Sequence, residues 1–150
     1  MKKADFLVVF GLDDKRYALP LSAIDRVVRM VEITPFPEAP DIILGVVNFQ
    51  GQVTPVFNIR KRFNLPKRDI VITDRLIFAH TARRVVALVA DVVLDVCVAE
   101  NVIASGDMLS RAKHVEGVAK LADGLVFIHD LDKFLSLEEA DALDQALEGS

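Results

Sequence analysis

The sequence predicts a mainly β protein made of two small, closed or nearly closed barrels that share a core, with a short helix at the end. Short apolar segments alternate with turn residues along most of the 150-residue chain, a pattern typical of short strands. Hydrophobic residues make up 52% of the chain, with Val, Ile and Leu dominant and no Trp, which favours strands over disorder. A unit of half this length buries a smaller fraction of its surface. We therefore expect the two barrels to pack together.

The first half of the chain begins with a predicted hairpin. Residues 6–12 and 17–21 are apolar and flank the polar turn 13–16, as two paired strands would. One helical turn follows, because Pro20 suits its start and Ser22 can cap it.

The next segments predict an exposed loop and a second hairpin. They are a strand at 27–33, a loop with three prolines at 34–40, and paired strands at 45–49 and 52–59. Gly51 at the second position of the connecting turn permits the positive φ of a tight hairpin. Pro55 lacks an amide proton, so its strand should lie at an edge or carry a bulge.

The segment LPKRD, residues 65–69, is the expected internal boundary. After it come a hairpin of residues 74–81 and 85–93, a strand that continues to 99, two strands around the turn Asp123–Gly124, and helical spacing over 131–147. Residues 100–116 show no clear period. We expect one domain over 1–150, with a first barrel at 9–68, a second at 70–136 and a C-terminal helix at 137–147.

Charge and composition exclude several classes of protein. The net charge of −4 and the pI of about 5.3 disfavour a protein that binds nucleic-acid phosphates or anionic lipid. The single cysteine, Cys97, cannot form an intrachain disulfide and fits the cytoplasm. The apolar run 6–12 follows Asp5 and precedes two aspartates, so we interpret it as a strand and not a signal peptide. The region 85–99 is too short to span a membrane.

No pattern in the sequence predicts catalysis or a cofactor. The three histidines are scattered, Cys97 lies between valines, and no phosphate-binding glycine motif occurs, so metal, nucleophile and nucleotide sites all lack their parts. Asp91 and Asp95 could share one strand face, but solvated roles explain the paired carboxylates. We expect a non-catalytic module without cofactor or metal.

Two other functions stay open at this point. A barrel resembling the OB fold could bind oligonucleotides through the basic cluster of residues 60–68, although such a site needs stacking aromatics and the chain has one Tyr and no Trp. The other alternative is an accessory enzyme subunit, which no residue pattern in the sequence supports.

Three segments in order carry a family resemblance. YALPLSAIDRVVR, then ITPFPEAPDIILGVVNFQGQVTPVFNIRKRF, then DGLVFIHDLDKFL resemble the CheW-like domain of bacterial chemotaxis coupling proteins. The resemblance runs from Phe6 to about Leu137, and its motifs are specific only as a set. The kinase CheA and the protein CheV carry related domains, but the absence of a kinase or receiver domain points to a free-standing coupling protein.

The resemblance implies two five-stranded SH3-like barrels around a joint core and no catalysis. It also implies two partners, the regulatory domain of a CheA-type histidine kinase and the cytoplasmic tip of methyl-accepting chemotaxis receptors, in a membrane-attached array reached through those partners. A CheW-like scaffold for a non-flagellar pathway is the alternative within the family.

This sequence departs from the family pattern at three positions. Gln50 stands where an Arg is usual, Asn58 where an Asp is usual, and Arg26 where an acidic residue is frequent. An amide cannot form an ion pair but still donates and accepts hydrogen bonds.

The resemblance also suggests binding residues. We expect the receptor-binding set to be Ile24, Arg26, Val27, Val28, Gly45, Val46, Asn48 and Gln50. The alternative for Ile24, Val27, Val28 and Val46 is an ordinary core position. We expect the kinase-binding set to be Phe57, Arg60, Met108, Leu109 and Gly117.

Overall fold

The computed structural model describes residues 6–98, 102–104, 115–121 and 124–148. The strands are β1 (Phe6–Leu12), β2 (Lys15–Pro20), β3 (Ile24–Arg29), β4 (Ile43–Phe49), β5 (Gln52–Phe57), β6 (Arg75–His80), β7 (Val85–Ala90), β8 (Val92–Val98), β9 (Val102–Ala104), β10 (Val115–Leu121) and β11 (Gly124–His129). The helices are the short α1 (Ile59–Arg62), the C-terminal α2 (Leu137–Glu148), and 3-10 turns η2 (Leu21–Ala23) and η3 (Leu131–Lys133).

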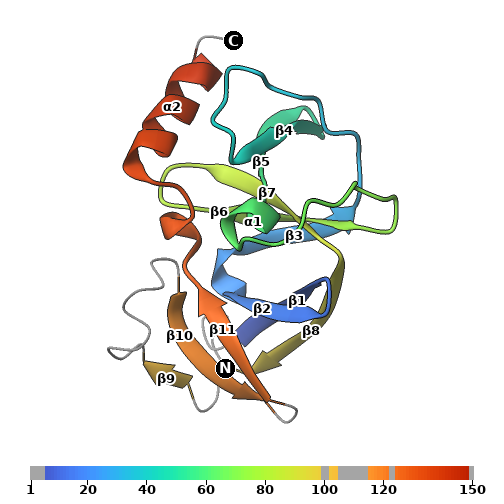
Figure 1. Cartoon of the computed structure of the whole chain (residues 1–150), viewed down its shortest axis with the longest axis vertical. Coiled ribbons are helices and arrows are strands. Elements are labelled where there is room, and N and C mark those ends of the chain that lie inside the picture. The colour runs from blue at the N-terminus through green and yellow to red at the C-terminus, as the bar shows by residue number, and fades with distance from the viewer. Residues whose placement is uncertain (1–5, 99–101, 105–114, 122–123, 149–150) are drawn as a thin grey trace.

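These strands form two sheets, one above the other in Figure 1. One sheet has the order β8-β1-β2-β11-β10-β9 and the other the order β3-β6-β7-β5-β4. Helix α2 lies beside the second sheet (Figure 1). The predictions of a mainly β fold and of a terminal helix at 137–147 are confirmed. The sheets are open and not closed barrels in the described part of the chain, because no backbone ladder joins the edge strands of either sheet there.

The sheets do not follow the two halves of the chain. The prediction placed residues 9–68 in one barrel and 70–136 in the other, whereas β1 and β2 join β8 and β11 in the six-stranded sheet, and β3 to β7 form the other. Leu7 pairs with Cys97, for example, and Tyr17 with Phe127 in parallel. Local patterns show which residues form strands, but pairing between strands so distant in sequence leaves no local signal.

The predicted hairpins are confirmed, and one strand is shifted. Gln50 and Gly51 have φ values of 54° and 84°, as a tight turn between β4 and β5 requires. The strand predicted at 27–33 instead begins at Ile24 and ends at Arg29. Thr34 then exchanges two backbone hydrogen bonds of 2.8 Å with Val46 on β4.

That bridge explains how β5 tolerates Pro55. Pro55 lies opposite Val46, whose amide and carbonyl both bond to Thr34 on the other side of β4. The pair Val46–Pro55 is therefore a non-hydrogen-bonded pair of the antiparallel ladder. The proline nitrogen faces β7, whose pairing with β5 starts only at Val56. β5 is not an edge strand, but no ladder bond is lost at Pro55.

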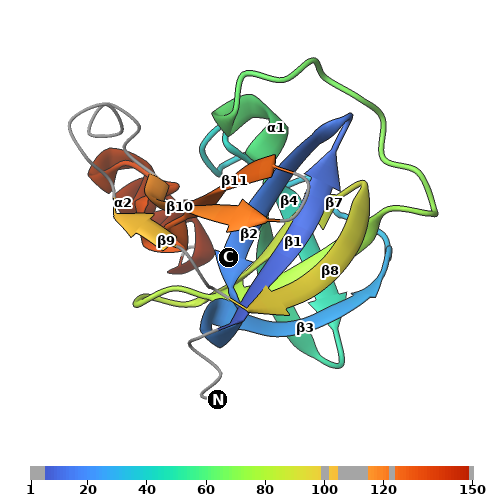
Figure 2. The ribbon, with the colours of Figure 1, turned by 90° about the horizontal axis from the view of Figure 1, so that it is seen from below.

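A joint core lies between the two sheets, as predicted. Its largest cluster contains Phe10 from the six-stranded sheet, Ile77 and Leu88 from the five-stranded sheet, and Leu143 from α2. Each is at most 1% exposed, and burying a side chain of this size contributes roughly 1.5–3 kcal/mol. Figure 2 views the molecule from below, where edge strands β8 and β3 of the two sheets lie on the same side.

Candidate docking surface

The two edge strands of the five-stranded sheet meet through side chains. Arg26 on β3 donates from Nη1 to Oε1 of Gln50, 3.2 Å away, and its guanidinium lies 5.4 Å from the ring centre of Phe49. Gln50 reaches Arg26 from the tight turn after β4. Such a contact between a cation and a ring contributes about 0.5–1 kcal/mol at an exposed site.

Exposed apolar side chains lie on the neighbouring positions of the chain. Val27 on β3 is 40% exposed and Val53 on β5 is 58% exposed. We call Arg26, Val27, Phe49, Gln50 and Val53 the rim. A surface that combines a cation, an amide and apolar side chains suits protein docking. It offers no nucleophile and no acid–base pair.

The structure separates the predicted receptor-binding residues into two groups. Arg26, Val27, Asn48 and Gln50 are exposed. Ile24 is 5% exposed and belongs to the joint core, and Val28 and Val46 are half-buried. Sequence reasoning missed Phe49 and Val53, whose place on the rim depends on how β3 approaches the β4–β5 turn.

Gly45 is buried and has a packing role. A Cβ atom on Gly45 would lie 2.3 Å from the carbonyl oxygen of Thr34, well inside the contact distance of any real side chain. The loop that carries Thr34 can approach β4 only because position 45 has no side chain.

The predicted kinase-binding residues are mostly enclosed. Phe57 is 2% exposed in the joint core, Gly117 is buried in β10, and Met108 and Leu109 lie outside the described residues. Arg60 is 12% exposed and holds an ion network. None of the described members offers an open apolar surface.

The network of Arg60 connects four segments of the chain. Arg60 on α1 contacts Asp13 in the β1–β2 turn at 2.7 Å and Asp91 between β7 and β8 at 2.9 Å. Asp91 also binds Arg68, whose guanidinium contacts the buried Asp74 at 2.7 Å. These ion pairs fasten the loop between α1 and β6 to both sheets.

The same network sets the charge state of Asp91. Burial opposes ionisation, but hydrogen bonds from the Asp13 amide, Arg68 and Arg60 outweigh it and hold the pKa of Asp91 below its ordinary value. Asp95, predicted as a possible partner, is exposed on β8 and takes no part in this network. The basic cluster is thus largely neutralised, since Arg62 likewise pairs with Glu139 at 2.7 Å.

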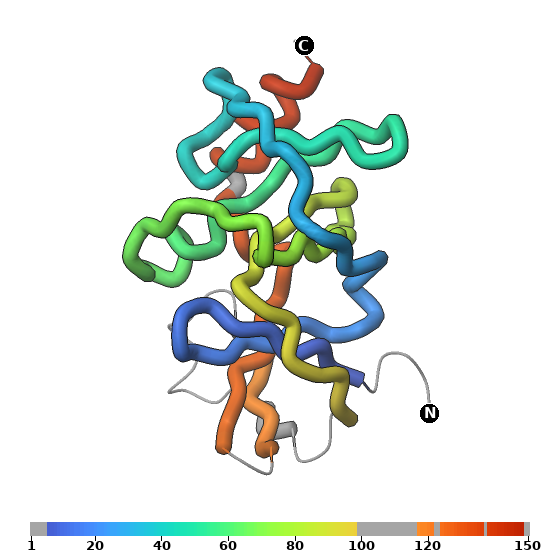
Figure 3. Tube along the Cα trace, turned by 90° about the vertical axis from the view of Figure 1, so that its right-hand side faces the viewer, coloured from blue at the N-terminus to red at the C-terminus, as the bar shows by residue number. Residues whose placement is uncertain are grey.

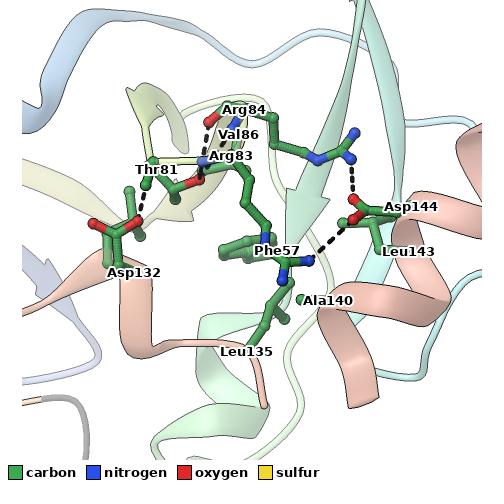
Figure 4. Close-up of a pocket in the computed structure, with 12 residues that line it drawn as sticks. Phe57, Thr81, Arg83, Arg84, Val86, Asp132, Leu135, Ala140, Leu143 and Asp144 are labelled. Atoms are coloured by element: carbon green, nitrogen blue, oxygen red, sulfur yellow. Dashed lines mark hydrogen bonds and ion pairs between the residues drawn. The ribbon is translucent and has the colours of Figure 1, made fainter. Parts of the chain in front are cut away.

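A pocket of about 250 Å³ lies between α2 and the β6–β7 turn (Figure 4). Phe57, Leu135 and Leu143 contribute apolar side chains to its wall. Arg83 and Arg84 at its mouth both pair with Asp144 of α2. Because these charges are paired with one another, we interpret the pocket as part of the interface where α2 packs against the β6–β7 turn.

The thiol of Cys97 is not activated in this geometry. Burial, with a smaller contribution from Asp95, raises the pKa of Cys97, which disfavours the reactive thiolate. Among the described residues no group of three His, Cys, Asp or Glu side chains could hold a metal ion. No helix in the described ranges combines the length and apolarity needed to cross a membrane.

Sequence reasoning also missed two exposed apolar groups. Ile70, Val71 and Ile72 in the loop before β6 are 40%, 44% and 85% exposed. Val92, Leu94 and Val96 on the edge strand β8 are also exposed. Runs of β-branched residues suggest buried strands, and nothing in the sequence alone shows that these remain at the surface.

The chain is similar in sequence and in fold to known proteins. The model of the CheW-like domain matches residues 7–139. Chemotaxis protein CheW of Bacillus subtilis is 30% identical over 97% of each chain, and chemotaxis protein CheW of Rhizobium meliloti is 25% identical over 91% of this chain and 90% of its own. The crystal structure of the scaffolding protein TtCheW from Thermoanaerobacter tengcongensis superposes with a TM-score of 0.80 at 30% identity, covering 91% of this chain and 95% of the other.

Proposed function

The chain belongs to the CheW-like domain family and is a chemotaxis coupling adaptor, and on this premise we propose that it links methyl-accepting receptors to a CheA-type histidine kinase without catalysing a reaction. The protein would act by holding its two partners in one complex. By binding both partners at once, it makes their encounter intramolecular. The state of the receptor can then shift the kinase between active and inactive populations. The adaptor would join the membrane-attached receptor array through these partners.

The rim is the proposed contact for the cytoplasmic tip of the receptor. The observation that carries this proposal is the contact of Arg26 with Gln50 and Phe49, together with the exposure of Val27 on β3 and Val53 on β5. Asn48 is also exposed, on the same strand as Phe49. Ile24, Val28, Gly45 and Val46 are buried or half-buried and are not proposed as contact residues.

The departures at positions 26 and 50 fall on the same contact. The family pattern has a frequent acid and a usual Arg at these positions, and here Arg26 instead donates to the amide oxygen of Gln50. The positive charge of this contact therefore lies on β3, and the turn after β4 carries a neutral amide. We propose that this exchange tunes which receptors the rim accepts.

The experiment is calorimetric titration of the purified protein with a receptor-tip fragment and, separately, with the kinase regulatory domain. Gln50→Arg places two cations together, and Val53→Ser removes apolar surface. We expect both variants to weaken receptor binding by about threefold to tenfold, because each loses one contact. Gln50→Glu is the matched control, since a carboxylate still accepts from Arg26. Unchanged receptor affinity in both Gln50→Arg and Val53→Ser would remove the rim as the receptor site.

The same adaptor chemistry could serve a pathway that does not drive flagella, and the geometry of the rim is compatible with either output. The oligonucleotide alternative gains no support. Arg60, Arg62 and Arg68 of the basic cluster are paired with carboxylates, and so would have to abandon those partners to bind phosphate.

A further inference from the structure

A short apolar loop is held open to solvent next to β6. Ile72 at its tip is 85% exposed, and its neighbours Ile70 and Val71 are 40% and 44% exposed. Three consecutive exposed β-branched residues expose apolar area to water, and contiguous exposed apolar area often marks a site of interaction with another protein.

The loop is fixed in this position by a buried carboxylate. Asp74 is 2% exposed, accepts a hydrogen bond of 2.9 Å from the Val71 amide, and pairs with Arg68. The Asp74 amide in turn donates to the Val71 carbonyl at 3.0 Å. Arg68 is anchored on Asp91. The apolar side chains are therefore presented by a pre-organised loop, which lowers the entropy cost of docking.

Two arginines lie side by side at the base of the loop. Arg29, the last residue of β3, pairs in register with Arg75, the first residue of β6. Like charges directly opposite each other on paired strands are destabilising. Arg75 donates only to the carbonyls of Thr73 and Asp74, and within the described ranges no carboxylate forms an ion pair with Arg29 or Arg75. This positive charge is left for a partner.

We propose that Ile70, Val71, Ile72, Arg29 and Arg75, the loop patch, dock the regulatory domain of the kinase through an apolar face bordered by carboxylates. This inference rests on the proposed adaptor function. An adaptor that holds two proteins at once needs two surfaces without shared residues, and the loop patch shares none with the rim. Figure 3 shows the β4–β5 turn of the rim and the segment after α1 projecting on opposite sides of the chain trace.

The kinase-binding residues predicted from the sequence are less accessible than the loop patch. Phe57 and Gly117 are buried, and Arg60 is committed to Asp13 and Asp91. Arg60 acts here as a positioning residue, because Asp91 joins it to Arg68 and so to the loop.

The test is calorimetric titration of Ile72→Ser and Arg29→Glu variants with the kinase regulatory domain and the receptor-tip fragment. Neither side chain is buried, so both variants should fold, and circular dichroism confirms it. We expect each to weaken kinase binding by about tenfold or more. Ile72→Ser should leave receptor binding unchanged, whereas Arg29 lies two positions after Val27 of the rim on β3 and is scored on kinase binding alone. Leu125→Ser is the matched control, since Leu125 is 61% exposed on β11 and should leave both affinities unchanged.

Kinase affinity within about twofold of wild type in both loop variants would overturn the inference while leaving the adaptor function intact. An equal loss in Leu125→Ser would also overturn it, because the effect would not be specific to the loop. If the wild-type protein itself fails to bind the kinase domain, the proposed function fails first, and the two failures are thereby distinguished.

Discussion

Replacing Asp91 by Asn tests whether the ion network fastens the two sheets together. Asp91 accepts from the Asp13 amide at 2.6 Å and from Arg60 and Arg68, and its side chain is 21% exposed. Asn keeps the size and one acceptor oxygen but loses the charge. Both arginines keep a second carboxylate, Asp13 for Arg60 and Asp74 for Arg68.

The magnitude follows from that geometry. A hydrogen bond to a charged group contributes roughly 1.5–3 kcal/mol. Because neither arginine is orphaned and the site is partly solvated, Asp91→Asn should lose the equivalent of about one such bond, about 2–3 kcal/mol in the free energy of unfolding. For a chain of this size the thermal midpoint should fall by roughly 4–12 °C.

The pH dependence has a definite sign. The pKa of Asp91 is lowered from its ordinary 3.8, so the carboxylate stabilises the fold above that value and the contribution is lost as the pH falls through the lower, folded-state pKa. The free-energy gap between wild type and Asp91→Asn should be constant near neutrality and shrink below about pH 4.

The assay is denaturant unfolding followed by circular dichroism at a series of pH values. Asp95→Asn is the control, because Asp95 is an exposed carboxylate four positions further along the chain and should change stability by no more than about 0.5 kcal/mol. If Asp91→Asn also stays within that range at neutral pH, or if its gap to wild type does not depend on pH, the reasoning about the network is wrong.

Two further predictions concern packing and titration. Gly45→Ala forces the new Cβ against the Thr34 carbonyl and breaks the two bonds between Thr34 and Val46, so stability should fall by about 2–4 kcal/mol; an unchanged denaturation midpoint would show that the loop moves away at no cost. Burial and the nearby Asp13 raise the pKa of Tyr17. Because Tyr17 is the single tyrosine and there is no Trp, phenolate absorbance reports it alone. A midpoint at or below that of a free tyrosine would contradict the burial of the Tyr17 hydroxyl and its place beside Asp13.

The sequence was sufficient to predict most elements but not their partners. The turn at Gln50–Gly51 and the helix after residue 137 follow from local chemistry, namely positive φ and apolar spacing. The pairing of β1 with β8 joins residues such as Leu7 and Cys97, and no local pattern encodes such a distant choice. The assignment of strands to barrels by halves of the chain failed for that reason.

The residues of the candidate site were likewise predictable only in part. Family resemblance placed Arg26 and Gln50 in one set, and the structure shows that they touch. It could not show that Phe57 is buried, because an apolar residue near a strand end has the same sequence signature inside and outside a core. Ile72 was missed for the converse reason, since its exposure depends on how Asp74 holds the loop.

The most direct test of the adaptor account is calorimetric titration of the receptor-tip fragment into the preformed complex of this protein with the kinase regulatory domain. The account predicts saturable one-to-one binding of the receptor fragment, with the kinase domain still bound and an affinity close to that for the free adaptor. Displacement of the kinase domain by the receptor fragment, or no binding of either partner to folded protein, would contradict the claim that this chain bridges the two.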